Sequence, residues 1–316
     1  AAKVYQYLEI KNTNIADTDI SKATISFAVL KSWLTSNNVK EDDVVLEIGT
    51  GTGGLTRLLA ERGRHVFTVE VDRKLFELSS DILKLYKNVT LINADILKTK
   101  HELNPDVLSL VDNWRKEHNQ AHIKVVSNLP YNISTPVIIN LLESELPINL
   151  IVLMLQKEIT ERMAAMPSTR EYGILSVLTQ LFSDVEVIKT LSPQVFWPKP
   201  NVYSAIVKVV VRKDKYANRI TDYLFFKKII HAIFTSRRKT LLNSLENLKL
   251  PNILREDLKG IIRNMQLDER VRGETLNLDQ LIHLSEAIRN FNVALTLLHE
   301  GDNKIYTPDT ATKQAQ

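Results

Sequence analysis

Residues 43–54 read DVVLEIGTGTGG, and this stretch decides the fold. Its first half is a run of apolar, mostly branched residues, which is typical of a buried strand. Its second half is rich in glycine, which permits a sharp turn and a close approach of the backbone to a ligand. The next stretch, LTRLLAERG at 55–63, has helical spacing. A strand that leads through a glycine turn into a helix is typical of nucleotide-binding α/β proteins.

The same alternation continues along the chain. Apolar or alternating stretches predict further strands at 65–72, 88–96, 123–131, 149–156 and 204–212, and helical spacing predicts helices at 28–39 and 73–86. Strands that alternate with helices indicate an α/β fold with a mostly parallel sheet covered on both faces.

Helical spacing dominates beyond residue 212. It predicts helices at 225–234, 240–245, 254–265 and 278–291. We therefore expect an α/β domain over residues 1–212 and a smaller α-helical domain over residues 213–300. The polar residues 301–316 predict a disordered tail.

Composition narrows the range of functions. The 316 residues carry a net charge of +4 and no cysteine, which excludes disulfides and thiolate metal sites. No apolar run has the roughly 18 residues that a membrane span requires, and no signal peptide is evident, so we expect a cytoplasmic protein without membrane contact. The basic residues crowd between 208 and 239, which favours a polyanionic partner.

Three acidic residues are expected where ligands bind in open α/β sheets, at the carboxyl ends of the strands. Glu47 precedes the glycines, Glu70 follows them by roughly 20 residues, and Asp95 follows the next strand. The glycines also fit the G-x-G-x-x-G pattern of NAD-dependent oxidoreductases. Carboxylates would repel a pyrophosphate but tolerate the cationic sulfur of S-adenosylmethionine, so we prefer the latter cofactor.

The segment Asn128, Leu129, Pro130 and Tyr131 indicates the chemistry. An exocyclic adenine amine is a weak nucleophile because its lone pair is delocalised into the ring. Two hydrogen-bond acceptors, one for each amine hydrogen, localise the lone pair on the nitrogen. The Asn128 side chain can supply one carbonyl, and the main chain of Leu129 or Pro130 can supply the other. Tyr131 can stack on the base.

These motifs resemble the ribosomal RNA adenine N6-dimethyltransferase family, small-subunit type. The matching strings are LEIGTGTGGLT, VEVD, NADIL, VVSNLPYNIS, QKEITERM, EYGILSV, VFWPKPNVYSAIV, IFTSRRKTLLNSL and RGETLNLDQL, in family order from about residue 44 to 282. The resemblance implies a Rossmann-like class I methyltransferase domain with a helical domain behind it. It also implies dimethylation of adenine N6 in small-subunit ribosomal RNA, with S-adenosylmethionine as methyl donor.

The resemblance also implies site residues. The cofactor would be held by Glu47, Gly49, Gly51 and Gly53 at its methionine side, by Glu70 at its ribose, by Asp95 at its adenine amine, and by Asn128. The target base would be held by Asn128, Leu129, Pro130 and Tyr131, with Phe196 stacked on it. RNA phosphates would be bound by Lys199 and by Arg237, Arg238 and Lys239, which we expect at a helix start.

The expected partner is ribosomal RNA or a small-subunit precursor, and the expected state is a monomer. We expect no metal: His118 and His122 have the spacing of helical ligands, but no third ligand accompanies them.

Three departures from the family pattern leave an alternative open. Residues 19–25, DISKATI, stand where the family has G-Q-x-F-L, Tyr203 replaces an aspartate, and the polar segment 98–120 is longer. The alternative is a divergent paralogue that methylates a different RNA, or that binds RNA as a non-catalytic assembly factor.

Overall fold

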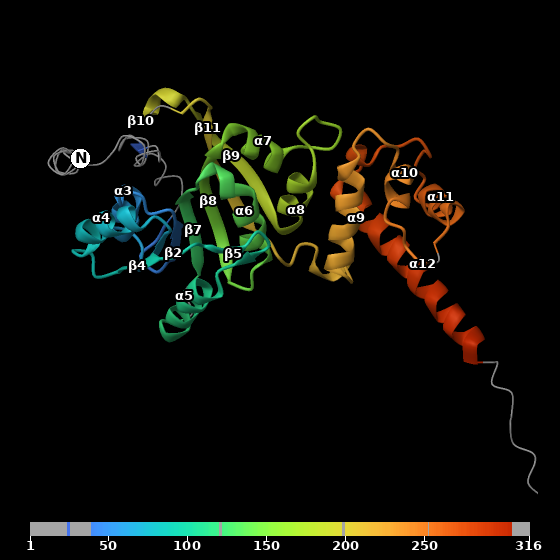
Figure 1. Cartoon of the computed structure of the whole chain (residues 1–316), viewed down its shortest axis with the longest axis horizontal. Coiled ribbons are helices and arrows are strands. Elements are labelled where there is room, and N and C mark those ends of the chain that lie inside the picture. Colours follow the sequence, from blue (N-terminus) through green and yellow to red (C-terminus); the bar gives the residue numbers. More distant parts are fainter. Residues whose placement is uncertain (1–23, 26–38, 120–121, 198–199, 252, 305–316) are drawn as a thin grey trace, which may run out of the picture. The chain divides into compact units, whose positions relative to one another are not determined.

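A computed structural model describes residues 24–25, 39–119, 122–197, 200–251 and 253–304 (Figure 1). The chain forms two compact units, Ala1–Ala164 with Leu178–Lys215, and Ala165–Val177 with Tyr216–Gln316. The division after Lys215 lies three residues beyond the expected boundary at 212. The sequence contained no sign that 165–177 joins the second unit. The predicted helix at 28–39 falls on residues that, apart from Val39, lie outside the described part.

A seven-stranded sheet forms the core of the first unit. Its strands, in spatial order, are β4 (Val89–Asn93), β3 (His65–Glu70), β2 (Val44–Ile48), β7 (Ile123–Asn128), β8 (Ile148–Gln156), β11 (Ser204–Val211) and β9 (Ser183–Leu191). The first five run parallel, and β11 is antiparallel to both of its neighbours. The expected mostly parallel sheet is confirmed, but sequence reasoning missed the edge strand β9. Its interior is mostly charged or half-exposed and has no apolar run.

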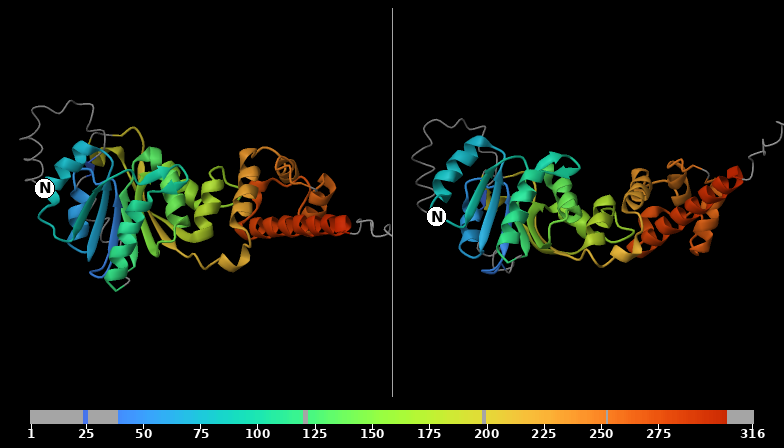
Figure 2. Two further views of the ribbon diagram at one scale, coloured as in Figure 1. Left: turned by 60° about the horizontal axis from the view of Figure 1, so that its bottom comes forward. Right: turned by 90° about the horizontal axis from the view of Figure 1, so that it is seen from below.

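Helices lie against both faces of this sheet (Figure 2). They are α3 (Gly54–Ala60), α4 (Arg73–Leu83), α5 (Pro105–Glu117), α6 (Ser134–Glu143), α7 (Lys157–Ala164) and α8 (Ile174–Phe182), the last of which continues from the second unit into the first. The described part of the polar segment, residues 98–119, is structured: it contains α5 and most of a hairpin of β5 (Leu97–Thr99) and β6 (Glu102–Leu103). Two short strands, β1 (Thr24–Ile25) and β10 (Phe196–Trp197), pair with each other.

The second unit is helical apart from its loops. Its helices are α9 (Tyr223–Thr235), α10 (Leu241–Glu246), α11 (Arg255–Asn264) and α12 (Leu278–Lys304). The side chain of Asp222 caps α9 by accepting a bond from the Phe225 N–H, 2.9 Å away. Because α12 continues to Lys304, residues 301–304 are helical and not part of a disordered tail; residues 305–316 lie outside the described part. No described helix is long and apolar enough to cross a bilayer.

An aromatic cluster holds α5 against strand β3. The His65 ring lies 4.8 Å from Phe67 and 4.5 Å from Trp114, measured between ring centroids, and Trp114 stacks on His118 at 3.9 Å. The Nε2 atom of His65 is hydrogen-bonded to the Thr90 hydroxyl, 2.8 Å away. Burial, together with the charge of His118, lowers the pKa of His65 to about 4. The folded protein therefore favours the neutral ring.

We expect this cluster to make the first unit sensitive to acid. The unfolded chain protonates His65 near pH 6.5, but the folded chain does so only near pH 4, so stability is lost as the pH falls through this window. The loss between pH 7 and pH 5 should be about 1 kcal/mol, since the half-exposed ring is screened by solvent. Urea unfolding of wild type and His65→Gln at both pH values checks this. If wild type and His65→Gln lose the same free energy of unfolding between pH 7 and pH 5, the prediction is wrong.

Candidate active site

The expected site residues gather at one edge of the sheet. Strands β4, β3, β2 and β7 are parallel neighbours, so their carboxyl ends meet there. The glycine turn (residues 49–53) follows β2, Glu70 ends β3, and Asn128 ends β7. Asp95 follows β4 by two residues and is exposed. The topology thus brings together four segments that span 80 residues of sequence, from Gly49 to Asn128.

The glycine turn needs its glycines because of its backbone conformation. Gly49, Gly51 and Gly53 have φ angles of +86°, +57° and +74°, a region that strains other residues. A Cβ atom on Gly49 would lie 3.6 Å from both the Asn128 carbonyl oxygen and the Pro130 Cδ, which is ordinary van der Waals contact. A Cβ atom on Gly51 would meet nothing within 4 Å. The turn therefore lies close to Asn128 and Pro130 at Gly49 and borders open space at Gly51.

Glu70 is tied to this turn. Its Oε2 accepts a hydrogen bond from the Gly51 N–H at 2.9 Å, and its Oε1 accepts one from the Asp72 N–H at 3.0 Å. The side chain is fully buried, so a ribose would have to share these acceptors. Asp95 is more open. Its Oδ1 accepts a bond from the Leu97 N–H at 2.9 Å, and its Oδ2 has no partner among the described residues.

Glu47 lies beneath the turn, buried in a network of threonines. Its Oε2 accepts hydrogen bonds from the hydroxyls of Thr56 at 2.5 Å and Thr68 at 2.6 Å, and Thr68 is bonded in turn to Thr50 at 2.7 Å. Its Oε1 is buried without a partner. Burial raises the pKa of Glu47 to about 8, against the effect of the two threonines. An unpartnered acidic oxygen below the turn fits the cationic groups of S-adenosylmethionine.

The segment after β7 makes a tight turn, here called the amine turn (residues 128–131). Pro130 is extended, with φ −57° and ψ 133°, and a single 3₁₀ turn, η1 (Tyr131–Ile133), follows it. The Pro130 carbonyl accepts bonds from the Ile133 N–H at 3.3 Å and from the Ser134 hydroxyl at 3.0 Å. The side-chain amide of Asn128 makes no hydrogen bond within the described part of the chain. Leu129 is buried, and Tyr131 is half-buried.

Phe196, which we expect to stack on the target base, is largely buried. Its side chain is only 5% exposed and belongs to a buried apolar cluster with Leu191 and Ile206. Its stacking on a base stays a prediction. The Tyr131 side chain, also expected in the target pocket, is partly exposed to solvent. Lys199, also expected beside the pocket, lies outside the described residues.

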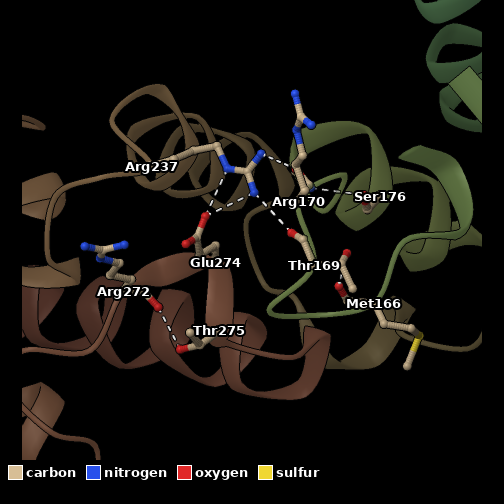
Figure 3. Close-up of polar contacts among 9 residues, drawn as sticks. Met166, Thr169, Arg170, Ser176, Arg237, Arg272, Glu274 and Thr275 are labelled. Carbon is tan, nitrogen blue, oxygen red and sulfur yellow. Dashed lines mark hydrogen bonds and ion pairs between the residues drawn. The ribbon is translucent and has the colours of Figure 1, made fainter. Parts of the chain in front are cut away.

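The basic residues 237–239 lie in a turn between α9 and α10, not at a helix start as expected. Thr240 caps α10, which begins at Leu241. Arg237 points inward: its guanidinium binds the Glu274 carboxylate at 3.0 Å and donates to the carbonyls of Arg170 at 2.6 Å and Thr169 at 3.2 Å (Figure 3). Arg237 thus holds the 165–177 loop through its guanidinium, and its expected contact with RNA stays a prediction.

Arg238 and Lys239 are exposed and make no ion pair with any described residue. They remain the residues of this turn that can meet a phosphate.

Several site residues were missed, although Thr56, Ser127 and Ser204 lie within the quoted strings, because no role was assigned to their hydroxyls. Thr56 and Thr68 hold Glu47, and Ser204 is bonded to Tyr131. The Ser127 hydroxyl accepts a bond from the Ile48 N–H at 2.7 Å and so joins β2 to β7 where both approach the site. These are single hydroxyls in strands or a helix, and only their partners reveal their role.

We expect Arg237 to contribute to stability and its neighbour Arg238 to contribute to RNA binding. Arg237→Ala leaves Glu274 without its partner and should cost about 1–3 kcal/mol of stability. Arg238→Ala should leave stability unchanged but weaken RNA binding, with a smaller salt dependence. Thermal unfolding and filter binding at two salt concentrations measure both effects. Equal stability of the two variants would refute the inward role of Arg237.

Comparison with known proteins identifies the family of the chain. Residues 10–283 match the family model for ribosomal RNA adenine dimethylase. The chain is 36% identical over 278 residues to ribosomal RNA small subunit methyltransferase A of a Geobacillus species, covering 87% of this chain and 89% of the relative. It is 40% identical over 254 residues to the protein of the same name from Bacillus licheniformis, covering 79% and 83%.

Solved structures agree on the fold. A dimethyladenosine transferase from Plasmodium falciparum superposes with a TM-score of 0.66 at 25% identity, covering 81% of this chain and 94% of that one. The 23S rRNA methyltransferase ErmE superposes with a TM-score of 0.58 at 22% identity, covering 82% and 96%. The first unit is accordingly a Rossmann-like methyltransferase domain whose methyl donor is S-adenosylmethionine. The chain belongs to the ribosomal RNA adenine dimethylase family.

Proposed function

We propose that this chain transfers methyl groups from S-adenosylmethionine to the N6 amino groups of adenines in small-subunit ribosomal RNA, two to each amine. One observation carries the proposal: the glycine turn and the amine turn lie so close that a Cβ atom added to Gly49 would be in van der Waals contact with Asn128 and Pro130. A donor held over the glycines and an amine held at Asn128 would then be neighbours. Reaction by proximity requires this arrangement.

The amine turn offers two acceptors for the two amine hydrogens. The Asn128 side chain is the first, because its amide is not engaged elsewhere in the described part of the chain. The sequence did not decide whether the main-chain acceptor is the carbonyl of Leu129 or that of Pro130. Since the Pro130 carbonyl already accepts two internal bonds, the geometry favours the Leu129 carbonyl. The two bonds localise the nitrogen lone pair and direct it toward the donor.

The remaining steps need little from the protein. When bound, S-adenosylmethionine supplies a methyl group on a sulfonium sulfur. The amine nitrogen forms the new bond to carbon as the carbon–sulfur bond breaks, and the cationic amine then loses a proton to water. No strong general base is required, which agrees with a turn whose acceptors are carbonyls. Catalysis would rest on positioning and on electrostatics.

We also propose the finer properties of this enzyme. Its partner would be the small ribosomal subunit or its precursor in the cytoplasm, and it would act as a monomer. The exposed cations Arg238 and Lys239 support a phosphate contact. Identities of 36–40% to small-subunit methyltransferases, over most of the chain, favour an active enzyme over a non-catalytic assembly factor.

The proposal is tested directly with undermethylated small subunits and isotopically labelled S-adenosylmethionine. We expect label to enter the RNA, and mass mapping of nuclease fragments to find dimethyladenine. Saturating cofactor without any transfer to subunits or free RNA would contradict the proposal. Transfer to the large-subunit RNA alone would correct the substrate.

Variants of Asn128 test the amine acceptor. Asn128→Ala removes the side-chain oxygen and should lower the transfer rate by about 10²- to 10³-fold, the usual loss for one preorganised hydrogen-bond partner. Asn128→Asp keeps an acceptor oxygen and should retain more activity than Asn128→Ala. Because Asn128 is also expected to contact the cofactor, calorimetry with S-adenosylmethionine measures any loss of cofactor affinity, and rates are compared at saturating cofactor. Equal rates for Asn128→Ala and wild type would exclude this role.

Glu47 should couple cofactor binding to proton release. At pH 7 its carboxyl is protonated in the free protein, because the pKa is raised to about 8. A cation bound above it lowers that pKa, so binding should release up to one proton and tighten as the pH rises from 7 to 8. Titration calorimetry in buffers of different ionisation enthalpy counts the protons. Glu47→Gln should abolish the proton release. If that variant releases as many protons as wild type, the proton comes from another group.

A further inference from the structure

Ser204 is a buried hydroxyl at the point where strand β11 begins. Its backbone pairs with Gln156 of β8 on one side and with Leu191 of β9 on the other. The residue is fully buried, although Tyr203 just before it is 55% exposed. Ser204 is therefore held by the sheet on both sides, within hydrogen-bonding distance of Tyr131. A group fixed in this way can serve as an anchor for a more mobile one.

The Ser204 hydroxyl is bonded to the hydroxyl of Tyr131, with an oxygen–oxygen distance of 2.9 Å. The two residues are 73 positions apart in the sequence. Tyr131 itself is half-buried and sits in the short 3₁₀ turn after Pro130. A bond at the far end of the ring fixes the direction in which the ring axis points, and phenolic hydrogen bonds favour partners near the ring plane, which also biases rotation about that axis. A buried hydroxyl such as that of Ser204 also loses free energy if it is left unpaired, which favours keeping this bond.

We infer that Ser204 is a positioning residue for the methyl-transfer reaction: through the Tyr131 hydroxyl it holds in place the ring on which the target adenine stacks. The inference rests on the proposed function, which places the base against Tyr131. The position of the ring sets the position of the base, and hence the aim of its amine at Asn128 and Leu129. A small tilt would misdirect both hydrogen bonds at once.

The size of the effect follows from the geometry of transfer. Displacement of a reacting group by about 1 Å costs about 10²-fold in rate. Loss of the bond frees the ring without removing it, so Ser204→Ala should lower the rate of the chemical step by about 10- to 100-fold. Cofactor affinity should not change, because the glycine turn and the acidic residues do not contact Ser204 through any bond of the described chain.

A merely structural role for Ser204 makes a different prediction. In that case Ser204→Ala would lower the melting temperature but leave the rate per folded molecule intact. Ser183 provides a matched control. It is a buried serine on the neighbouring strand β9, paired with the opposite end of β11, and its hydroxyl donates to the Thr179 carbonyl at 2.6 Å. Ser183→Ala should lose a comparable amount of stability and keep the wild-type rate.

A double-mutant cycle tests the inference. Single-turnover methyl transfer to undermethylated small subunits is measured for wild type, Tyr131→Phe, Ser204→Ala and the double variant, with calorimetry of S-adenosylmethionine and thermal unfolding on each. We expect the two single variants to lose rate by similar factors. The double variant should be no slower than either, since the two hydroxyls act as one bond. Ser204→Thr, which restores a hydroxyl, should recover most of the rate.

The outcomes separate the two claims. A wild-type rate in Ser204→Ala, or losses that multiply in the double variant, would overturn the positioning role and leave the proposed function standing. If Ser204→Ala folds too poorly for assay, Tyr131→Phe alone tests the positioning role. A wild-type rate in Tyr131→Phe would overturn that role, because Ser204 acts only through the tyrosine hydroxyl. Failure of wild type to transfer any methyl would overturn the proposed function, and this inference with it.

Discussion

The approach of two backbone turns at the carboxyl edge of the sheet is the constraint on which the site depends. Gly49 adopts a left-handed conformation and lies against the Asn128 carbonyl, at a distance where a Cβ atom would be in van der Waals contact. Strands β2 and β7 are parallel neighbours, so their following turns must leave the sheet side by side. A methyl donor and an amine can meet there without any movement of the sheet.

Buried hydroxyls and one carboxyl hold this arrangement from below. Ser127 accepts a bond from the Ile48 N–H, which joins the two strands at their ends. Glu47 gathers Thr56 and Thr68 under the glycine turn, with its own charge suppressed by burial. Such polar networks are costly when partly satisfied and rigid when complete. The Glu47 Oε1 atom, which is buried and has no hydrogen-bond partner among the described residues, marks the place where a cationic ligand would complete the network.

Charge alone did not show which basic residues of the second unit are free to meet a phosphate. Arg237 sits in the most basic run of the chain, but its side chain is only 36% exposed and its guanidinium is bound to Glu274 and to two loop carbonyls. Guanidinium groups suit such inward roles because their fixed fork of donors can bind several acceptors at once. Its neighbours Arg238 and Lys239 have no such contacts and face solvent.

Local patterns by themselves determined the strand at Val44–Ile48, the turn after it, the parallel sheet and the acids at its edge, because apolar periodicity and glycine act over a few residues. Tertiary structure alone decided the rest. Phe196 is in the core, Arg237 turns inward, and Ser204 meets Tyr131 across 73 residues. Each of these outcomes depends on which distant strands and loops become neighbours, and a hydroxyl, a ring or a guanidinium carries no local sign of the partner it will find.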